Sequence, residues 1–196
     1  MFYKFLILLL FMLSLPLQFV IAIAIFITSD LPIVYKQKRV GKGGNTFSLY
    51  KFRTVVTGAD RIQKKYQKDN QADGPVFKIH NDPRFTTAGK FLSHTGLDEL
   101  PQLVNVLKGD MALIGPRPLP VDEAKKLKVW QQSRHRVLPG IISPWIVHGY
   151  HSTSFDEWMK SDIVYTKHKN FAYDIVLFLK TIRVVVGFML KELSIS

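Results

Sequence analysis

The sequence predicts an α+β fold with a small β-strand pair, several helices and a membrane-associated helix at each end. The chain has 196 residues, which suits one compact domain plus a membrane element. Its apolar residues gather towards the two ends. Two short strand-like segments, Ile33-Val34-Tyr35 and Thr46 to Phe52, flank a glycine-rich stretch, which has the composition of a turn.

The N-terminal segment is long and apolar enough to enter a membrane. No formal charge occurs from Phe5 to Ile27, and this stretch as a helix would extend about 35 Å, against a hydrocarbon core of about 30 Å. Pro16 removes a backbone donor and kinks or breaks a helix. Two interpretations stay open: a spanning helix, and a helix that bends at Ser14-Leu15-Pro16 and returns to the same face. A cleaved signal peptide is disfavoured, because the apolar run is long and Lys4 is the only charge before it.

The formal net charge of +12 favours anionic partners, which include nucleic acid, lipid headgroups and anionic substrates. Residues 36–53 contain no acid and a cluster of bases, namely Lys36, Lys38, Arg39, Lys42, Lys51 and Arg53. Such a cluster directly after an apolar membrane segment marks the cytoplasmic side. The chain has no cysteine, which excludes disulfides and thiolate metal sites.

The C-terminal segment, Phe171 to Leu193, is apolar but interrupted by charges. Three of these, Lys180, Arg183 and Lys191, fall within about a quarter of a helical wheel. We expect an amphipathic helix in the membrane interface, and a helix packed in the core of the domain is the alternative. The predicted organisation is a membrane helix over residues 1–29, a cytosolic domain over 30–170 and the interfacial helix over 171–196.

Between the ends, the polar residues 57–74 predict a helix followed by a loop. An apolar stripe at helical spacing predicts a helix from about Asp98 to Leu107, ended by Gly109. A further helix is predicted from Ala124 to Arg136, because it has acids at its start (Asp122, Glu123) and bases at its end (Arg134, Arg136), as the helix dipole favours.

Asp98 and Glu99 are adjacent carboxylates in a basic protein. One interpretation is structural, because acids complement the dipole of a helix start and aspartate is a good N-cap, although Pro101 has no N–H to be capped. The other interpretation is chemical. A carboxylate can attack phosphorus to form an acyl phosphate. A neighbouring carboxylate can hold Mg²⁺, which shares oxygen ligands with substrate phosphates and reduces the repulsion between two anions.

The stretch Gly115-Pro116-Arg117-Pro118 follows this pair. Two prolines around one arginine predict a stiff, extended loop that holds the guanidinium in a fixed place, where its planar fork matches phosphate oxygens. Lys51 and Arg53 are further anion-binding candidates, because strand alternation puts both on one face. A solvated turn and a solvated strand face are the plain alternatives.

These motifs together resemble the bacterial sugar transferase family. Its members are monotopic phosphoglycosyl transferases and include undecaprenyl-phosphate galactose and glucose phosphotransferases. The resemblance runs from roughly Phe5 to Leu190, and its most specific part is the block from Asp98 to Pro118. The motifs that carry it are, in order, Tyr50-Lys51-Phe52-Arg53-Thr54, Asn81-Asp82-Pro83-Arg84, Leu97-Asp98-Glu99-Leu100-Pro101-Gln102, Asn105-Val106-Leu107-Lys108-Gly109-Asp110-Met111, Gly115-Pro116-Arg117-Pro118 and Pro139-Gly140-Ile141.

The resemblance implies a mostly helical fold and a Mg²⁺-dependent enzyme at the cytoplasmic face of the bacterial inner membrane. In the two-step reaction that it implies, Asp98 attacks the sugar-bearing phosphate of a UDP-sugar and UMP leaves. The phosphosugar then passes from the aspartate to a polyprenol (undecaprenyl) phosphate, as the first step towards a surface glycan or glycoconjugate. Glu99 is expected to take part in Mg²⁺ binding, and the residues expected to bind substrate are Lys51, Arg53, Arg84 and Arg117.

The resemblance also implies a re-entrant membrane helix broken at a Ser-Pro pair, here matched by Ser14 and Pro16, with membrane lipid as a partner. Nucleic acid is not an expected partner, because no nucleic-acid-binding motif is visible. Leu15, Ser93 and Tyr150 depart from the family pattern, the last two standing where arginine is usual. The loss of two cations motivates a second hypothesis, a catalytically weak or inactive member that acts as a membrane-bound assembly partner.

Overall fold

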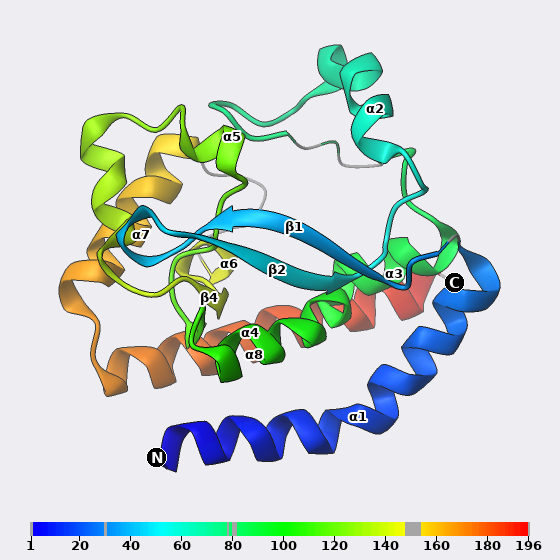
Figure 1. Ribbon diagram of the computed structural model, residues 1–196, viewed down its shortest axis with the longest axis horizontal. Coiled ribbons are helices and arrows are strands. Elements are labelled where there is room, and N and C mark those ends of the chain that lie inside the picture. The colour runs from blue at the N-terminus through cyan, green and yellow to red at the C-terminus, as the bar shows by residue number, and fades with distance from the viewer. Residues whose placement is uncertain (1, 30, 78, 80–81, 148–153, 196) are drawn as a thin grey trace.

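Helices dominate the computed structural model, which describes residues 2–29, 31–77, 79, 82–147 and 154–195 (Figure 1). The α-helices are α1 Phe2–Thr28, α2 Ala59–Gln63, α3 Thr87–Thr95, α4 Leu103–Lys108, α5 Val121–Ala124, α6 Pro144–Val147, α7 Phe155–His168 and α8 Phe171–Ile195. The strands are β1 Val34–Val40, β2 Thr46–Phe52, β3 Ala112–Ile114 and β4 Gly140–Ile142. Short 3-10 helices occupy Lys42–Gly44, Lys64–Asp69, Leu97–Gln102 and Val129–Arg136. The predicted α+β fold with a predominance of helix is confirmed.

α1 is a long apolar helix that lies along the domain. Its stretch Tyr3–Thr28 is long and apolar enough to cross a membrane. Most of its large apolar side chains are exposed. Ile7 is buried against core residues of β2 and α4, whereas Ile21 and Ile25 are buried against residues that include Phe52 and Leu92. One side of α1 therefore anchors the helix to the domain, and the rest remains uncovered.

The predicted break in α1 is a bend and not an interruption. The helix continues through Pro16 and bends midway along its length (Figure 1). Ser14 contributes hydrogen bonds close to the proline: its Oγ donates to the Phe11 carbonyl (2.7 Å) and accepts from Gln18 Nε2 (2.8 Å). Side-chain hydrogen bonds of this kind compete with the backbone ladder and accompany bends in helices.

β1 and β2 form an antiparallel hairpin in which Val34 pairs with Phe52 at the open end. β2 has the predicted bounds, but β1 extends well beyond the predicted residues 33–35. The charged residues fit the strand because its side chains alternate: Lys36 and Lys38 are exposed, whereas Gln37 and Arg39 are partly buried. Part of the basic cluster is therefore the outer face of a strand.

A second pair of strands, β3 and β4, was not predicted. They pair in parallel, with Ala112 opposite Gly140, and each is only three residues long, too short to show an alternating pattern. Glycine allows the close approach, since a Cβ at Gly140 would lie 2.0 Å from the backbone nitrogen of Gly115. The pair holds the start of the loop formed by residues 115–118.

The helix predicted from Asp98 to Leu107 begins differently. Its first part is the 3-10 helix Leu97–Gln102, and α4 follows only after Pro101, which lacks the backbone N–H that an α-helical turn would use. The N-cap is Gly96, in the left-handed conformation at φ 72°. The interpretation of Asp98 as the N-cap is therefore wrong.

The prediction of one helix from Ala124 to Arg136 is also wrong. α5 ends at Ala124, and a separate 3-10 helix starts at Val129. The break lets Leu127 enter a core cluster with Leu119, Phe155, Trp158 and Met159. The side chain of Gln131 then accepts a hydrogen bond from the backbone N–H of Lys128 (2.8 Å), which caps the new helix. Burial of an apolar side chain outweighs the helical charge pattern here.

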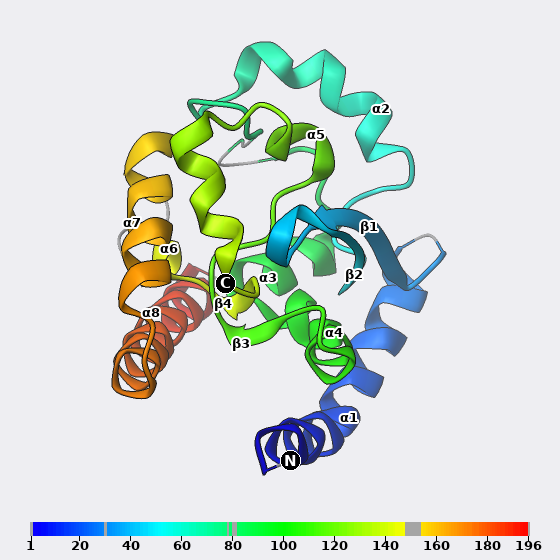
Figure 2. The same cartoon turned by 60° about the vertical axis from the view of Figure 1, so that its left-hand side comes forward.

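α8 confirms the predicted C-terminal helix and leaves an apolar face open. Leu177 and Thr181 are buried against the domain, so one stripe of α8 packs as a core helix does. The large apolar residues that remain exposed are Phe171, Ile175, Val176, Phe178, Leu179, Ile182, Val186 and Leu190. α1 and α8 lie on the same side of the domain, away from α2, in two different views (Figures 1 and 2).

Candidate active site

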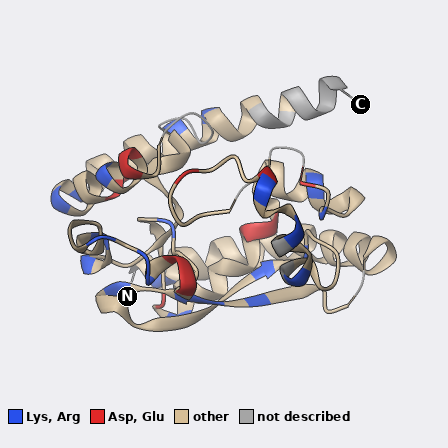
Figure 3. Cartoon of the chain, turned by 90° about the horizontal axis from the view of Figure 1, so that it is seen from above, with Lys and Arg blue, Asp and Glu red and all other residues tan. Residues whose placement is uncertain are grey.

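Four of the predicted site residues lie together around the 3-10 helix Leu97–Gln102. Lys51, near the end of β2, places its Nζ 4.0 Å from Asp98 Oδ2. Arg117, in the loop after β3, places its Nη1 2.7 Å from Glu99 Oε1. Acidic and basic residues are interspersed over the domain (Figure 3), and at this point two cations face two carboxylates.

Asp98 is only 5% exposed. Burial raises the pKa of its carboxyl to about 7; Lys51 and Arg117 oppose the rise, and Glu99 adds to it. Burial also lowers the pKa of Lys51, against the attraction of Asp98. The ionised carboxylate is thus held in surroundings that desolvate it, and further positive charge brought to the site would stabilise it.

The loop that carries Arg117 is fixed by two other arginines. Arg134 Nη2 donates to the carbonyl oxygen of Arg117 (2.6 Å) and to Asp162 Oδ2 (2.6 Å). Arg134 and Asp162 form an ion pair that is almost completely buried. Arg39 Nη1 donates to the carbonyl oxygen of Pro118 (3.0 Å). The prolines limit the conformations of the loop, and these hydrogen bonds fix its position.

Arg39, Arg134 and Asp162 were not predicted as part of the site. Arg39 was assigned to the basic cluster and Arg134 to a helix end. Asp162 could have been identified from the sequence. It lies on the buried face of α7, whose other buried residues are Phe155, Trp158, Met159 and Tyr165. A charged residue on an apolar stripe is rarely buried unless it is paired, so its position indicates a buried cation elsewhere in the chain.

Arg53 and Arg84, predicted to bind substrate, make other contacts. Arg53 is buried and donates to the Pro32 carbonyl (2.8 Å) and to Thr57 Oγ1 (3.1 Å). Arg84 forms an ion pair with Asp82 (2.6 Å). In the part of the chain that the structure describes, neither guanidinium has a hydrogen bond or ion pair to the two carboxylates of the site. Both bind local protein groups, and Arg53 ties the end of β2 to the chain before β1.

The carboxylate of Glu99 is of the kind that binds a magnesium ion shared with a substrate. Within the described ranges, no group of three or more His, Cys, Asp or Glu side chains gathers as a metal site. Mg²⁺ is usually bound through one or two carboxylates plus substrate phosphates and waters. Glu99, the residue predicted to take part in Mg²⁺ binding, offers one such carboxylate, and a phosphate-bearing substrate would complete the coordination.

The sequence model of one family, described as bacterial sugar transferase, matches residues 1–188. The chain belongs to this family. The match covers α1, the carboxylate pair and the loop around Arg117, so it confirms the resemblance of the motifs. Of the two positions where arginine is usual, Ser93 lies on α3, and Tyr150 lies outside the described residues.

The similar proteins include several sugar transferases. A galactosyl transferase CpsE from Streptococcus agalactiae is 41% identical over 169 residues, which are 83% of this chain and 38% of that protein. An undecaprenyl-phosphate galactose phosphotransferase from Salmonella typhimurium is 38% identical over 162 residues, 79% of this chain and 33% of that protein. An exopolysaccharide production protein ExoY from Rhizobium meliloti is 31% identical over 171 residues, 85% of this chain and 76% of that protein. The chain thus spans only about a third of the length of the first two.

Proposed function

We propose that this chain is a membrane-bound phosphoglycosyl transferase that moves a sugar-1-phosphate from a UDP-sugar to a polyprenol phosphate. The observation that carries the proposal is the buried Asp98, next to Glu99 and faced by Lys51 and Arg117. The side chain of Asp98 does not cap the helix. A carboxylate that is free of that role and lies beside cations is suited to attack an anionic phosphate. The name of the Salmonella relative describes transfer of a galactose phosphate to undecaprenyl phosphate.

In the first proposed step, an oxygen of Asp98 attacks the sugar-bearing phosphorus of the UDP-sugar. A bond forms between Asp98 and phosphorus, the bridging phosphorus–oxygen bond of the diphosphate breaks, and UMP leaves with the bonding electrons. Lys51 favours the ionised form of the nucleophile, against the burial that raises its pKa. Arg117 exchanges its ion pair with Glu99 for contacts with phosphate oxygens. Mg²⁺ held by Glu99 would supply positive charge that offsets the repulsion between the anions.

In the second step, a phosphate oxygen of the polyprenol phosphate attacks the same phosphorus. The bond to Asp98 breaks, the free carboxylate returns, and the product is a polyprenol diphosphate sugar. The two substrates therefore react in turn with one residue, which gives ping-pong kinetics. Such a product is the lipid-linked start of a surface glycan.

The membrane arrangement supports this chemistry. α1 and the apolar face of α8 lie on one side of the domain, and together they suit a domain that rests on the cytoplasmic face with α1 re-entrant. Because the chain has no cysteine, single cysteines at position 2 and at the exposed Lys36 can be labelled in intact cells and in inverted vesicles. Labelling of both only from the cytoplasmic side is expected, and labelling of position 2 only from outside would refute the re-entrant helix.

The decisive experiment traps the covalent intermediate. Purified protein in detergent is incubated with Mg²⁺ and a panel of UDP-sugars, without polyprenol phosphate, and the peptide that contains Asp98 is analysed by mass spectrometry. A sugar-phosphate adduct on Asp98 and release of UMP are expected. Asp98→Asn keeps the size of the side chain and should lower UMP release by orders of magnitude. Glu99→Gln should weaken activity in a way that added Mg²⁺ partly restores.

Two outcomes would contradict the proposal. UMP release by Asp98→Asn at the wild-type rate would show that Asp98 is not the nucleophile. Folded wild-type protein that releases no UMP from any UDP-sugar would favour the assembly-partner hypothesis, which the residues Ser93 and Tyr150 motivate.

A further inference from the structure

A cavity of about 270 Å³ opens beside Arg117. Its walls include Arg39, Gln71, Asp73, Phe77, Arg117 and Trp145. Asp98 and Glu99 are not among the described residues that line it. Arg117 does line it and also forms the ion pair with Glu99, so Arg117 connects the cavity to the two carboxylates. Ligand cavities commonly span about 300–1,000 Å³, so the volume suits one part of a nucleotide sugar and not the whole molecule.

Arg39 brings a second guanidinium to this cavity. Its Nη1 and Nη2 donate to the Pro118 carbonyl and to Gln37 Oε1 (3.0 and 2.6 Å), but its buried Nε has no hydrogen-bond partner among the described atoms. Burial, followed by the charge of Arg117, lowers the pKa of Arg39 to about 10. Glu123 compensates only partly, since burial raises its own pKa. Two guanidiniums that repel each other beside a cavity are stabilised by an anionic ligand.

We infer that this cavity receives the nucleoside monophosphate half of the donor, with Arg39 and Arg117 on its phosphate. The inference rests on the proposed function. In phosphoryl transfer the attacking and leaving oxygens lie roughly in line across the phosphorus. With Asp98 as the attacking group, the leaving nucleotide lies on the far side of the phosphorus. The cavity is lined by Arg117 but not by Asp98, so its position suits the leaving nucleotide.

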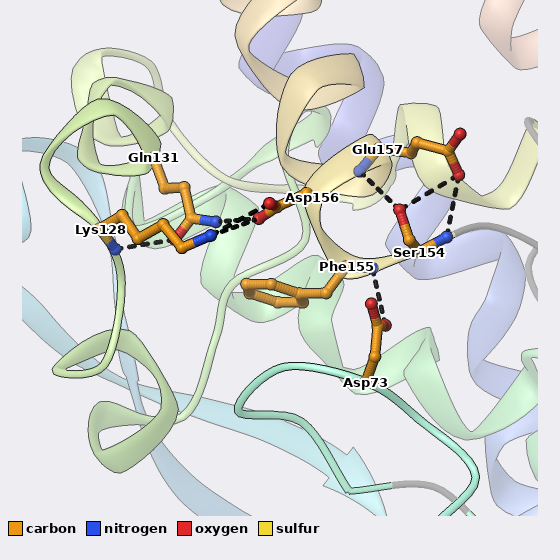
Figure 4. A network of polar contacts seen from close by, with 7 residues as sticks. All are labelled: Asp73, Lys128, Gln131, Ser154, Phe155, Asp156 and Glu157. Carbon is orange, nitrogen blue, oxygen red and sulfur yellow. Dashed lines mark hydrogen bonds and ion pairs between the residues drawn. The ribbon is translucent and has the colours of Figure 1, made fainter.

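The wall of the cavity formed by residues 71–77 is fixed by the first turn of α7. Asp73 Oδ1 accepts a hydrogen bond from the backbone N–H of Phe155 (2.7 Å) (Figure 4). Gly74, at φ 69°, packs so closely on the ring of Phe155 that a Cβ would lie 2.6 Å from it. In the same turn, Ser154 and Glu157 form a capping box. The wall is therefore tied to a well-capped helix.

The side chains of this wall suit a nucleoside. Phe77 and Trp145, which are only partly buried, bring aromatic rings to the cavity, and base stacking on aromatic rings stabilises nucleotide binding without strict sequence requirements. Gln71, also on the wall, has an amide that both donates and accepts hydrogen bonds. That is the chemistry offered by a pyrimidine edge or by ribose hydroxyls.

The test measures binding of UMP, uridine and glucose 1-phosphate to the full chain in detergent, by titration calorimetry with Mg²⁺ present. Arg39→Gln should weaken UMP binding at least about tenfold, because charge-assisted hydrogen bonds are lost, and should leave uridine binding unchanged. Lys38→Gln, an exposed cation next in the strand, is the matched control and should change nothing. Ala72→Phe, which fills the cavity from its wall, should remove both UMP and uridine binding while glucose 1-phosphate still binds.

Each contrary outcome is distinct. Unchanged UMP binding in both Arg39→Gln and Ala72→Phe, in protein that still turns over UDP-sugar, would overturn the cavity assignment and leave the proposed function intact. If Ala72→Phe loses glucose 1-phosphate binding but keeps UMP binding, the cavity binds the sugar and not the nucleotide. That result would also overturn the cavity assignment. A third result is that wild-type protein binds UMP, with weaker binding in Arg39→Gln, and yet releases no UMP from any UDP-sugar. That result would refute the proposed function and support the cavity as a nucleotide site.

Discussion

Asp162→Asn should reduce both the stability of the protein and its turnover. The substitution keeps the size of the side chain and removes the charge that pairs with Arg134. Both side chains are almost fully buried, at 0% and 1% exposure, so the guanidinium would remain buried without its counter-ion. Removing one partner of a buried ion pair commonly costs about 3–5 kcal/mol.

This cost can be measured as a shift of the melting temperature. For a chain of this length, about 1 kcal/mol corresponds to roughly 2–4 °C, so a fall of about 6–20 °C is expected in differential scanning fluorimetry. Asp156→Asn is the matched control on the same helix. Its pair with Lys128 is largely exposed, at 45% and 62%, so a loss of about 1 kcal/mol or less is expected.

A double substitution separates stability from positioning. Arg134→Met with Asp162→Leu removes both buried charges and should be more stable than Asp162→Asn. It still lacks the hydrogen bond from Arg134 to the Arg117 carbonyl, so UMP release should stay low at a temperature where the protein is folded. Equal melting shifts in Asp162→Asn and Asp156→Asn would refute the account of the buried pair. Full turnover by the double variant would show that the loop around Arg117 holds its position without Arg134.

Three further predictions follow from single residues. Arg117→Ala should lower turnover at least about tenfold with the fold intact, since losing one electrostatic clamp on phosphate costs on the order of 2–4 kcal/mol; unchanged kinetics would remove it from the site. Gly140→Ala should destabilise β3 and β4 by about 1–3 kcal/mol, because the Cβ would meet Gly115 at 2.0 Å, whereas Gly187→Ala, with open space around it, should not. Burial and Arg134 lower the pKa of His135 to about 4, so its contribution to stability is full above pH 6.5 and is lost as the pH falls towards 4; His135→Gln should flatten the melting temperature over that range.

Patterns local to the chain predicted α1, α2, α4, α8 and β2, whereas α3, α5, α6 and α7 were not predicted. The apolar run of α1, the spacing that ends at Gly109 and the bounds of β2 each depend on neighbouring residues alone. The failures have a common cause in contacts between distant segments. Leu127 breaks a predicted helix because it is buried with Leu119 and Phe155, and β3 is stabilised by pairing with β4, which no three-residue pattern can indicate.

For the site, the sequence by itself determined which residues the proposed chemistry uses, and the tertiary structure decided which of them lie together. Asp98, Glu99 and Arg117 were predicted from residue type, from local order and from a family resemblance, because these features are written along one stretch of chain. The structure added Arg39, and the pair of Arg134 with Asp162, to the loop around Arg117. It also gave Arg53 and Arg84 local partners away from the carboxylates. The reason is physical: a guanidinium becomes an anion site or a structural tie according to which carbonyls and carboxylates the fold brings within hydrogen-bonding distance, and sequence spacing does not encode that distance.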